Sequence, residues 1–133
     1  PTTDVYAYLE DVAPDGSSLL VTEGQRRANY HRRPAVVDSL PAEARLRAKP
    51  QLPWPGFTQA DFDPAPFAGG QTVHLVFDLM PTAWLFRAGH RIRLSLAGAD
   101  HDTFEPSPSA PQDLTWHLHR GDSQSTLVLP WVR

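Results

Sequence analysis

The region 77–97 constrains the fold more than any other part of the sequence, because it shows strand-like alternation on both sides of two turns. Phe77 and Leu79 alternate with Asp78 and Met80, and Arg91–Ala97 places apolar residues at every second position. Successive side chains of a β-strand point to opposite faces of the sheet, so this period of two predicts half-buried strands. The region therefore predicts a sheet with one apolar face and one face in water.

Six segments have the alternation or the composition of strands, and fourteen prolines and eight glycines punctuate the chain. Proline is poorly tolerated inside helices, and only 42–48 has the composition of a short helix. The predicted fold class is all-β, in a single domain over residues 1–133, with Trp84 and Trp116 in the core. The predicted strands are Val5–Val12, Leu19–Glu23, Val73–Leu79, Arg91–Ala97, Leu114–His119 and Thr126–Val132.

Residues 33–70 form a long excursion that is rich in proline and poor in periodicity. An excursion of this length is unusual inside a compact domain, so it either carries function or packs against something outside the chain. Its aromatic residues favour packing. We expect Trp54, Phe57 and Phe62, together with Trp131 near the end of the sequence, to form an interdomain or ligand-binding surface.

Charge and composition exclude several classes of partner. The net charge is −3 and the basic residues are scattered, so neither nucleic acid nor an anionic membrane is implied as a partner. No apolar run approaches the roughly 20 residues that a membrane helix needs. The absence of cysteine excludes disulfides, thiolate metal sites and a cysteine nucleophile. The absence of cysteine slightly favours a reducing cytosol as the cellular compartment, without fixing it.

No serine lies in the Gly-X-Ser-X-Gly elbow that presents the nucleophile of α/β-hydrolases. Gly121-Asp-Ser123 has the letters of a lipase block, but no apolar strand leads directly into it, and its residues are ordinary turn residues. Arg120-Gly-Asp122 has the letters of an adhesion motif and fits a hairpin loop better. We therefore predict no catalytic residue within this chain.

Two histidines, His117 and His119, would point to the same face of a strand, and His101 precedes them. This constellation would suit a small cupin-like metal enzyme. The favoured interpretation is that both histidines face solvent and alternate with buried Trp116 and Leu118, because partial constellations of this kind are common. We predict no metal and no cofactor at this place.

Acidic residues gather after the strand 91–97, at Asp100, Asp102 and Glu105. Their oxygens could ligate calcium, but the spacing lacks the EF-hand pattern and favours a solvated loop. His90 follows Ala88-Gly89 in a turn, where a hydrogen-bonded structural histidine is expected.

Three blocks of the sequence, at these spacings, resemble the C-terminal domain of serine hydrolases related to X-prolyl dipeptidyl peptidase, cocaine esterase and α-amino-acid ester hydrolases. The first, 4–28, reads as strand, Pro-Asp-Gly turn, strand and Gly-X-Arg-Arg-Ala. The second, 78–100, carries Asp-Leu-X-Pro-Thr-Ala and then Ala-Gly-His-Arg-Ile-Arg-Leu. The third, 116–132, ends in Leu-Val-Leu-Pro. The chain departs from the family at 99–102, where Ala-Asp-His-Asp replaces a Ser-Ser-Asp-Phe-Pro-type run.

The resemblance implies a jelly-roll β-sandwich, similar to galactose-binding domains, that lacks its first strands, since the family has further strands before the segment that matches Pro1. It also implies that the Ser, Asp and His triad lies in a preceding α/β-hydrolase domain of the parent chain. The implied role is to pack on that domain, shape its substrate cleft and bridge protomers. Unpaired strand edges add a homo-oligomer as a second candidate partner.

A free-standing carbohydrate-binding module is the alternative function, because such modules share the sandwich architecture and fold alone does not decide function. Its sugar platforms would be Trp54 or Trp131, since flat aromatic rings can stack on sugar rings.

Overall fold

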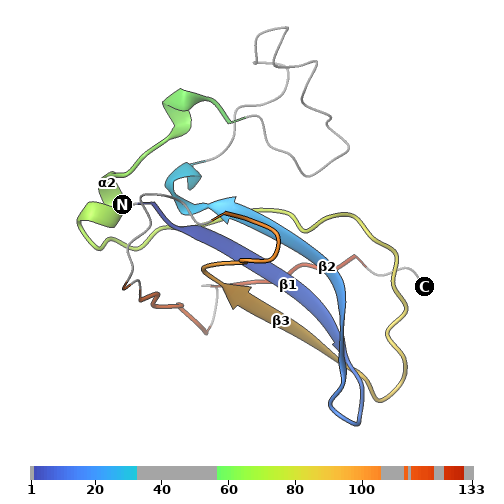
Figure 1. Ribbon diagram of the computed structural model, residues 1–133. Coiled ribbons are helices and arrows are strands. Elements are labelled where there is room, and N and C mark those ends of the chain that lie inside the picture. Colours follow the sequence, from blue (N-terminus) through green and yellow to red (C-terminus); the bar gives the residue numbers. More distant parts are fainter. Residues whose placement is uncertain (1, 33–56, 106–112, 114, 122–124, 131–133) are drawn as a thin grey trace, which may run out of the picture.

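The computed structural model describes residues 2–32, 57–105, 113, 115–121 and 125–130. Within them, β1 (Asp4–Val12), β2 (Ser18–Arg27) and β3 (Arg91–Ala97) form an antiparallel sheet in the order β2-β1-β3 (Figure 1). Three of the predicted strands are thereby confirmed, and the fold is mainly β, as predicted.

The central strand β1 carries most of the core because it has a neighbour on each side. Ala7 and Leu9 of β1 lie on the same face as Leu94 and Leu96 of β3. Ala7 and Leu9 are almost fully buried. The opposite face carries Tyr8 and other polar side chains. The buried apolar residues of the described chain are Tyr6, Ala7, Leu9, Val12 and Ala28.

A tight turn joins β1 to β2 and is held by its own polar groups. The Ala13 amide donates to the Ser17 carbonyl at 2.9 Å, and the Asp15 carboxylate accepts bonds from the Ser17 amide and hydroxyl. Gly16 has a φ of 89°, which a side chain would strain. This turn confirms the Pro-Asp-Gly turn predicted from the sequence.

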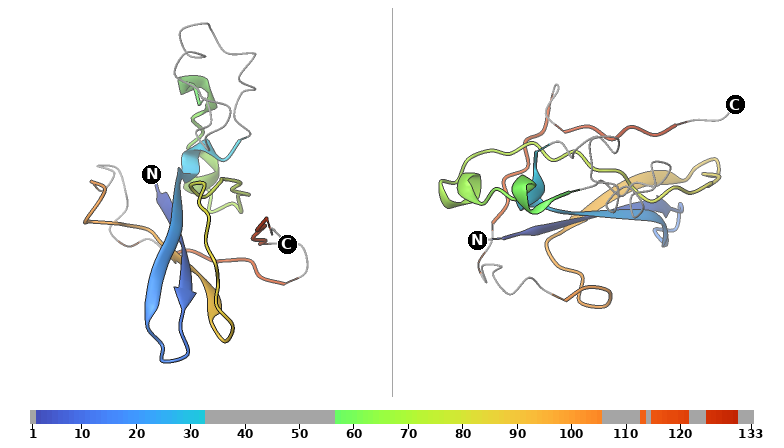
Figure 2. Two further views of the ribbon diagram at one scale, coloured as in Figure 1. Left: turned by 90° about the vertical axis from the view of Figure 1, so that its right-hand side faces the viewer. Right: turned by 90° about the horizontal axis from the view of Figure 1, so that it is seen from above.

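Among the residues after β2 that the structure describes, three short helical turns lie at one end of the sheet. These are η1 (Ala28–Tyr30), η3 (Gln59–Asp61) and α2 (Ala65–Ala68). Figures 1 and 2 show η3 and α2 beyond the end of β2 rather than over a sheet face. The sequence predicted helix within the excursion only at 42–48, which lies outside the described residues, so η3 and α2 are additions.

The predictions of strands at 73–79, 114–119 and 126–132 are wrong for the residues that the structure describes. Residues 73–79 are extended, and their burial alternates with a period of two, but they form no ladder. Where this segment crosses β2, the Met80 amide donates to the Glu23 carbonyl at 2.7 Å. The described parts of the other two segments, 115–119 and 126–130, also have no regular strand. In 73–79, the alternation of apolar residues therefore reflects an extended backbone with one side half-buried. It does not show that the segment is hydrogen-bonded to a neighbouring strand.

Two residues that were predicted in the core are exposed. The exposed fraction of Trp84 is 45% and that of Leu118 is 51%. Trp116 is half-buried, and its ring lies against Gly98, where an added Cβ would come within 3.1 Å. Among the described residues, no helix is long and apolar enough to cross a membrane.

Candidate functional site: an aromatic cluster and its polar supports

Three aromatic rings meet where β2 ends. The Tyr30 ring lies 5.2 Å from the ring of Phe57 and 5.5 Å from that of Phe62, measured between centroids. The sequence predicted Phe57 and Phe62 as surface aromatics, and both are half-buried. Their common partner, Tyr30, was missed, because it sits in a short 3₁₀ turn that carries no periodic signal. Trp54 and Trp131, the other predicted members and the candidate sugar platforms, lie outside the described residues.

Arg26 extends this cluster with a buried cation, since only 6% of the residue is exposed. Its Nε donates to the Tyr30 carbonyl at 3.0 Å, and its guanidinium carbon lies 4.0 Å from the centroid of the Phe57 ring. Burial lowers the pKa of Arg26, and the charge of Asp78 opposes that change. A ring face and a carbonyl, rather than a carboxylate in direct contact, thus stabilise this cation within the described residues.

Asp63 ties the segment after the excursion to the end of β2. Its amide donates to the Asn29 carbonyl at 2.9 Å, and its carboxylate accepts from Arg32 at 2.6 Å, with His31 Nε2 at 3.4 Å. The amide of Ala65, followed by the charge of Arg32, holds the pKa of Asp63 below its usual value. Asp63 therefore holds the segment that follows Phe62 against the end of β2, next to the aromatic cluster.

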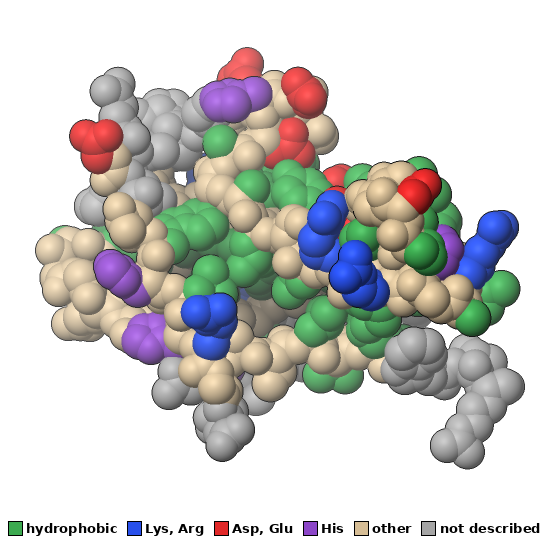
Figure 3. Space-filling view, turned by 90° about the horizontal axis from the view of Figure 1, so that it is seen from below, with side chains coloured by type: hydrophobic (Ala, Val, Ile, Leu, Met, Phe, Trp, Pro, Cys, Tyr) green, Lys and Arg blue, Asp and Glu red, His purple; other side chains and the backbone are tan. Residues whose placement is uncertain are grey.

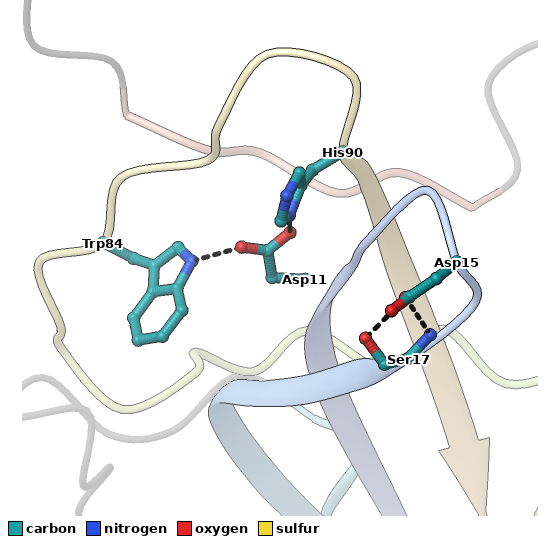
Figure 4. A network of polar contacts seen from close by, with 5 residues as sticks. All are labelled: Asp11, Asp15, Ser17, Trp84 and His90. Atoms are coloured by element: carbon teal, nitrogen blue, oxygen red, sulfur yellow. Dashed lines mark hydrogen bonds and ion pairs between the residues drawn. The ribbon is translucent and has the colours of Figure 1, made fainter.

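A second polar centre lies at the opposite end of β1. Asp11 is 5% exposed; its Oδ2 accepts a bond from Trp84 Nε1 at 3.0 Å, and its Oδ1 lies 2.8 Å from His90 Nδ1 (Figure 4). Burial raises the pKa of Asp11, but the bonds from Trp84 and His90 outweigh it, so the pKa is lowered. The expectation of a hydrogen-bonded structural histidine at 90 is confirmed.

A carboxylate on the polar face of the sheet is equally well paired. Glu10 accepts two bonds from Arg93, at 2.8 and 2.9 Å, and further bonds from Ser18 and Ser95. Arg93 and then Ser95 lower the pKa of Glu10 to about 2. The Ser95 hydroxyl therefore serves a carboxylate, and among the described residues no serine hydroxyl bonds to a histidine ring.

The residues weighed as metal ligands are not brought together. His101, His117 and His119 are all exposed, and His119 Nε2 lies 3.3 Å from the Thr72 hydroxyl. In the part of the chain that the structure describes, no three His, Asp or Glu side chains could hold one metal ion.

The acidic loop after β3 contacts the sheet through a hydrogen bond and a ring contact. The Asp100 carboxylate accepts a bond from the Tyr8 hydroxyl at 2.8 Å, and the ring of Phe104 lies 5.2 Å from that of Tyr6. Asp102 and Glu105 are exposed. The loop therefore covers one end of the polar face through one of its three acidic residues.

Comparison with known proteins places the chain in a family. Residues 1–127 match the model of the X-Pro dipeptidyl-peptidase C-terminal non-catalytic domain. Over 103 residues, 77% of the chain, it is 42% identical to "Putative serine esterase Mb1866c" of Mycobacterium bovis and to "Putative serine esterase MT1883" of Mycobacterium tuberculosis. The matched segment spans 15% of the length of each relative. No solved structure matches the chain significantly. The chain belongs to the family of X-Pro dipeptidyl-peptidase C-terminal non-catalytic domains.

Proposed function

We propose that this chain is the non-catalytic C-terminal domain of an α/β-hydrolase-type serine hydrolase, and that it packs on the catalytic domain and shapes the substrate cleft. The parent would transfer an acyl group from an ester or amide to water through a Ser, Asp and His triad outside this chain. The names of the two mycobacterial relatives favour ester hydrolysis, and the family description favours dipeptide release.

The observation that carries the packing role is the exposure of large apolar side chains. Exposure reaches 86% at Val128 and 83% at Leu85, and other apolar residues on β2 and β3 are more than a third exposed. Figure 3 shows apolar side chains reaching the surface in the middle of one face of the molecule. Large exposed apolar patches on a soluble domain mark contact surfaces. Such a surface fits a domain that is covered by the rest of its parent.

The finer architecture belongs to the same proposal. We infer one domain over residues 1–133, with the excursion at 33–70, and a second sheet layer that completes a jelly-roll sandwich. The sheet supports this inference because one of its faces carries Leu94 and Leu96, which are 41% and 38% exposed and would be covered in a sandwich.

The first experiment measures the length of the native polypeptide by immunoblot of a cell extract, with an antibody raised to this chain. The expected band is several-fold larger than 14.8 kDa, the mass of the chain. A band at 14.8 kDa would contradict the proposal.

The second experiment tests packing in the parent enzyme. Leu85→Asp combined with Val128→Asp should loosen the interface, lower the melting temperature and raise the KM of ester or dipeptide hydrolysis. Gln71→Asp, at an exposed polar position, is the matched control and should leave both values unchanged. If the double variant and Gln71→Asp had the same melting temperature and the same KM, packing through Leu85 and Val128 would be refuted. The isolated chain should not hydrolyse p-nitrophenyl acetate above the buffer rate, and activity lost on mutation of Ser123 or Ser95 would refute the non-catalytic role.

A further inference from the structure

Arg26 reverses the usual relation between burial and pairing among the described arginines. Arg27, Arg32 and Arg93 each contact a carboxylate of the chain, and their side chains are 44%, 61% and 50% exposed. Arg26 is only 6% exposed, and among the described residues no carboxylate contacts it. Buried charges are ordinarily paired, because an ion loses its hydration when it leaves water. Arg26 therefore lacks the kind of partner that its burial requires.

The hydrogen-bond donors of Arg26 are only partly used. Its Nε donates to the Tyr30 carbonyl, and the Phe57 ring covers one face of the guanidinium. Neither contact uses the two Nη nitrogens, which carry four of the five N–H donors. Among the described residues no acceptor bonds to an Nη nitrogen, and neither nitrogen is among the fully enclosed unpaired atoms. The edge formed by these two nitrogens, the Nη edge, is therefore open to solvent.

Asp78 does not serve as the partner of this edge. Its charge opposes the lowering of the Arg26 pKa by burial, but the Asp78 carboxylate makes no direct contact with the guanidinium. Since the Phe57 ring blocks one face and Nε is engaged, the Nη edge best accepts a flat anion that lies in the guanidinium plane. A carboxylate has this shape and accepts two parallel N–H bonds from an arginine.

We propose that the Nη edge of Arg26 binds a carboxylate side chain of the catalytic domain, an inference that rests on the proposed function for the presence of that domain. The two mycobacterial relatives are several times longer than the segment they share with this chain, so ample polypeptide exists to supply the carboxylate. Arg26 also lies beside the half-buried rings of Tyr30, Phe57 and Phe62. Arginine and aromatic residues are enriched at the centres of protein interfaces.

Acetate tests whether the Nη edge accepts a carboxylate. It is titrated into the 133-residue chain, labelled with nitrogen-15 at its arginines, with chloride keeping the ionic strength constant. The Nε–H resonance of Arg26, assigned by its loss in Arg26→Lys, should move in a saturable way. That of Arg27 should stay in place, because its Nε and Nη2 already bond to Asp4. No response at Arg26, or an equal response at Arg27, would overturn the proposal.

The same titration of the intact parent identifies the source of the carboxylate. If the catalytic domain supplies it, the Nη edge is already occupied, and acetate should leave the Arg26 resonance in place. A response as large as that of the 133-residue chain would indicate a site for a free carboxylate, and would overturn the domain contact.

Variants of the parent test whether this ion pair holds the domains together. After a protease has cut the link between the domains, the C-terminal domain of Arg26→Met should dissociate about tenfold faster, because the buried carboxylate is left unpaired. Arg27→Met, which breaks a pair within the domain, is the control and should leave the rate unchanged. Equal rates in the two variants would overturn the proposal. If Leu85→Asp combined with Val128→Asp still speeds dissociation in that case, domain packing itself stands.

Discussion

The indole Nε1 of Trp84 donates a hydrogen bond to Oδ2 of Asp11, from 73 positions further along the sequence. His90 lies against the other oxygen of the same carboxylate, so both ends of the loop that precedes β3 are fixed to β1. The loop also closes on the first hairpin, since an added Cβ at Gly89 would lie 3.6 Å from the Pro14 ring. Asp11 therefore positions β3 relative to β1 through side chains as well as through the ladder.

Replacing Trp84 with Phe should destabilise the fold, because the ring is largely preserved but Oδ2 of a buried carboxylate loses its donor. The free energy of unfolding, measured by urea titration, should fall clearly. Leu85→Ala is the matched control in the same loop, and its loss should be several-fold smaller because Leu85 is 83% exposed. Equal losses would show that Trp84 acts through apolar contact alone.

Gly24→Ala should destabilise the sheet for a steric reason. A Cβ at this position would lie 2.4 Å from the Asp78 carbonyl oxygen and 3.1 Å from the Leu79 Cα, and both are backbone atoms. Overpacking of this kind costs about 1–3 kcal/mol of unfolding free energy. Gly69→Ala is the control, since its nearest new contact is a Gln71 side-chain atom at 3.7 Å. Urea titration of both variants measures the difference, which should vanish if residues 78–79 do not press on β2.

The bounds of the three strands could be predicted from the sequence in different degrees. The alternation in Arg91–Ala97 gave the bounds of β3, and that in Val5–Val12 missed one residue of β1. β2 was predicted to end at Glu23, just before the Gly-X-Arg-Arg-Ala run. The strand β2 continues to Arg27, and Gly24 lies inside it where the backbone of residues 78–79 comes too close for a side chain.

Side-chain partners were less predictable than strands. The structural role of His90 could be inferred from its turn, but its partner Asp11 lies 79 positions away. The apolar alternation around Trp84 predicted that it lies in the core. In the structure the Trp84 side chain is partly exposed, and its indole N–H donates to the buried carboxylate of Asp11. The sequence singled out Phe57 and Phe62 as members of an interdomain or ligand-binding surface, but it did not indicate that the Tyr30 ring contacts both of them. Local patterns report burial and extension, and they do not identify residues that meet through the tertiary fold.

Acid should destabilise the protein partly through Glu10. Its pKa is about 2 in the folded state and 4.5 ordinarily, so the folded state favours the ionised form. This contribution is present above pH 4.5 and is lost as the pH falls toward 2. The unfolding free energy of the unmodified chain should therefore fall more steeply in this range than that of Glu10→Gln. Glu105→Gln, at an exposed site, is the control and should keep the steep slope. Identical slopes for all three proteins would contradict this assignment.

Alkali should act on the opposite side of the pH range, through Tyr8. Burial, followed by the hydrogen bond to Asp100, raises the pKa of Tyr8 from 10.0 to about 12, so the folded state favours the neutral phenol. The resulting stability is complete below pH 10 and is lost as the pH rises toward 12. The unfolding free energy should fall in this range, and less steeply in Tyr8→Phe.

Spectrophotometric titration of the folded protein isolates this group, because tyrosinate absorbs where neutral tyrosine does not. Subtracting the curve of Tyr8→Phe from that of the unmodified chain should leave one tyrosine that titrates near pH 12. Asp100→Asn removes the charge that opposes ionisation but keeps an acceptor for the Tyr8 hydroxyl, so it should move that titration to lower pH. A difference curve centred on pH 10 in the unmodified chain would show that the Asp100 loop does not hold the Tyr8 phenol in the folded protein.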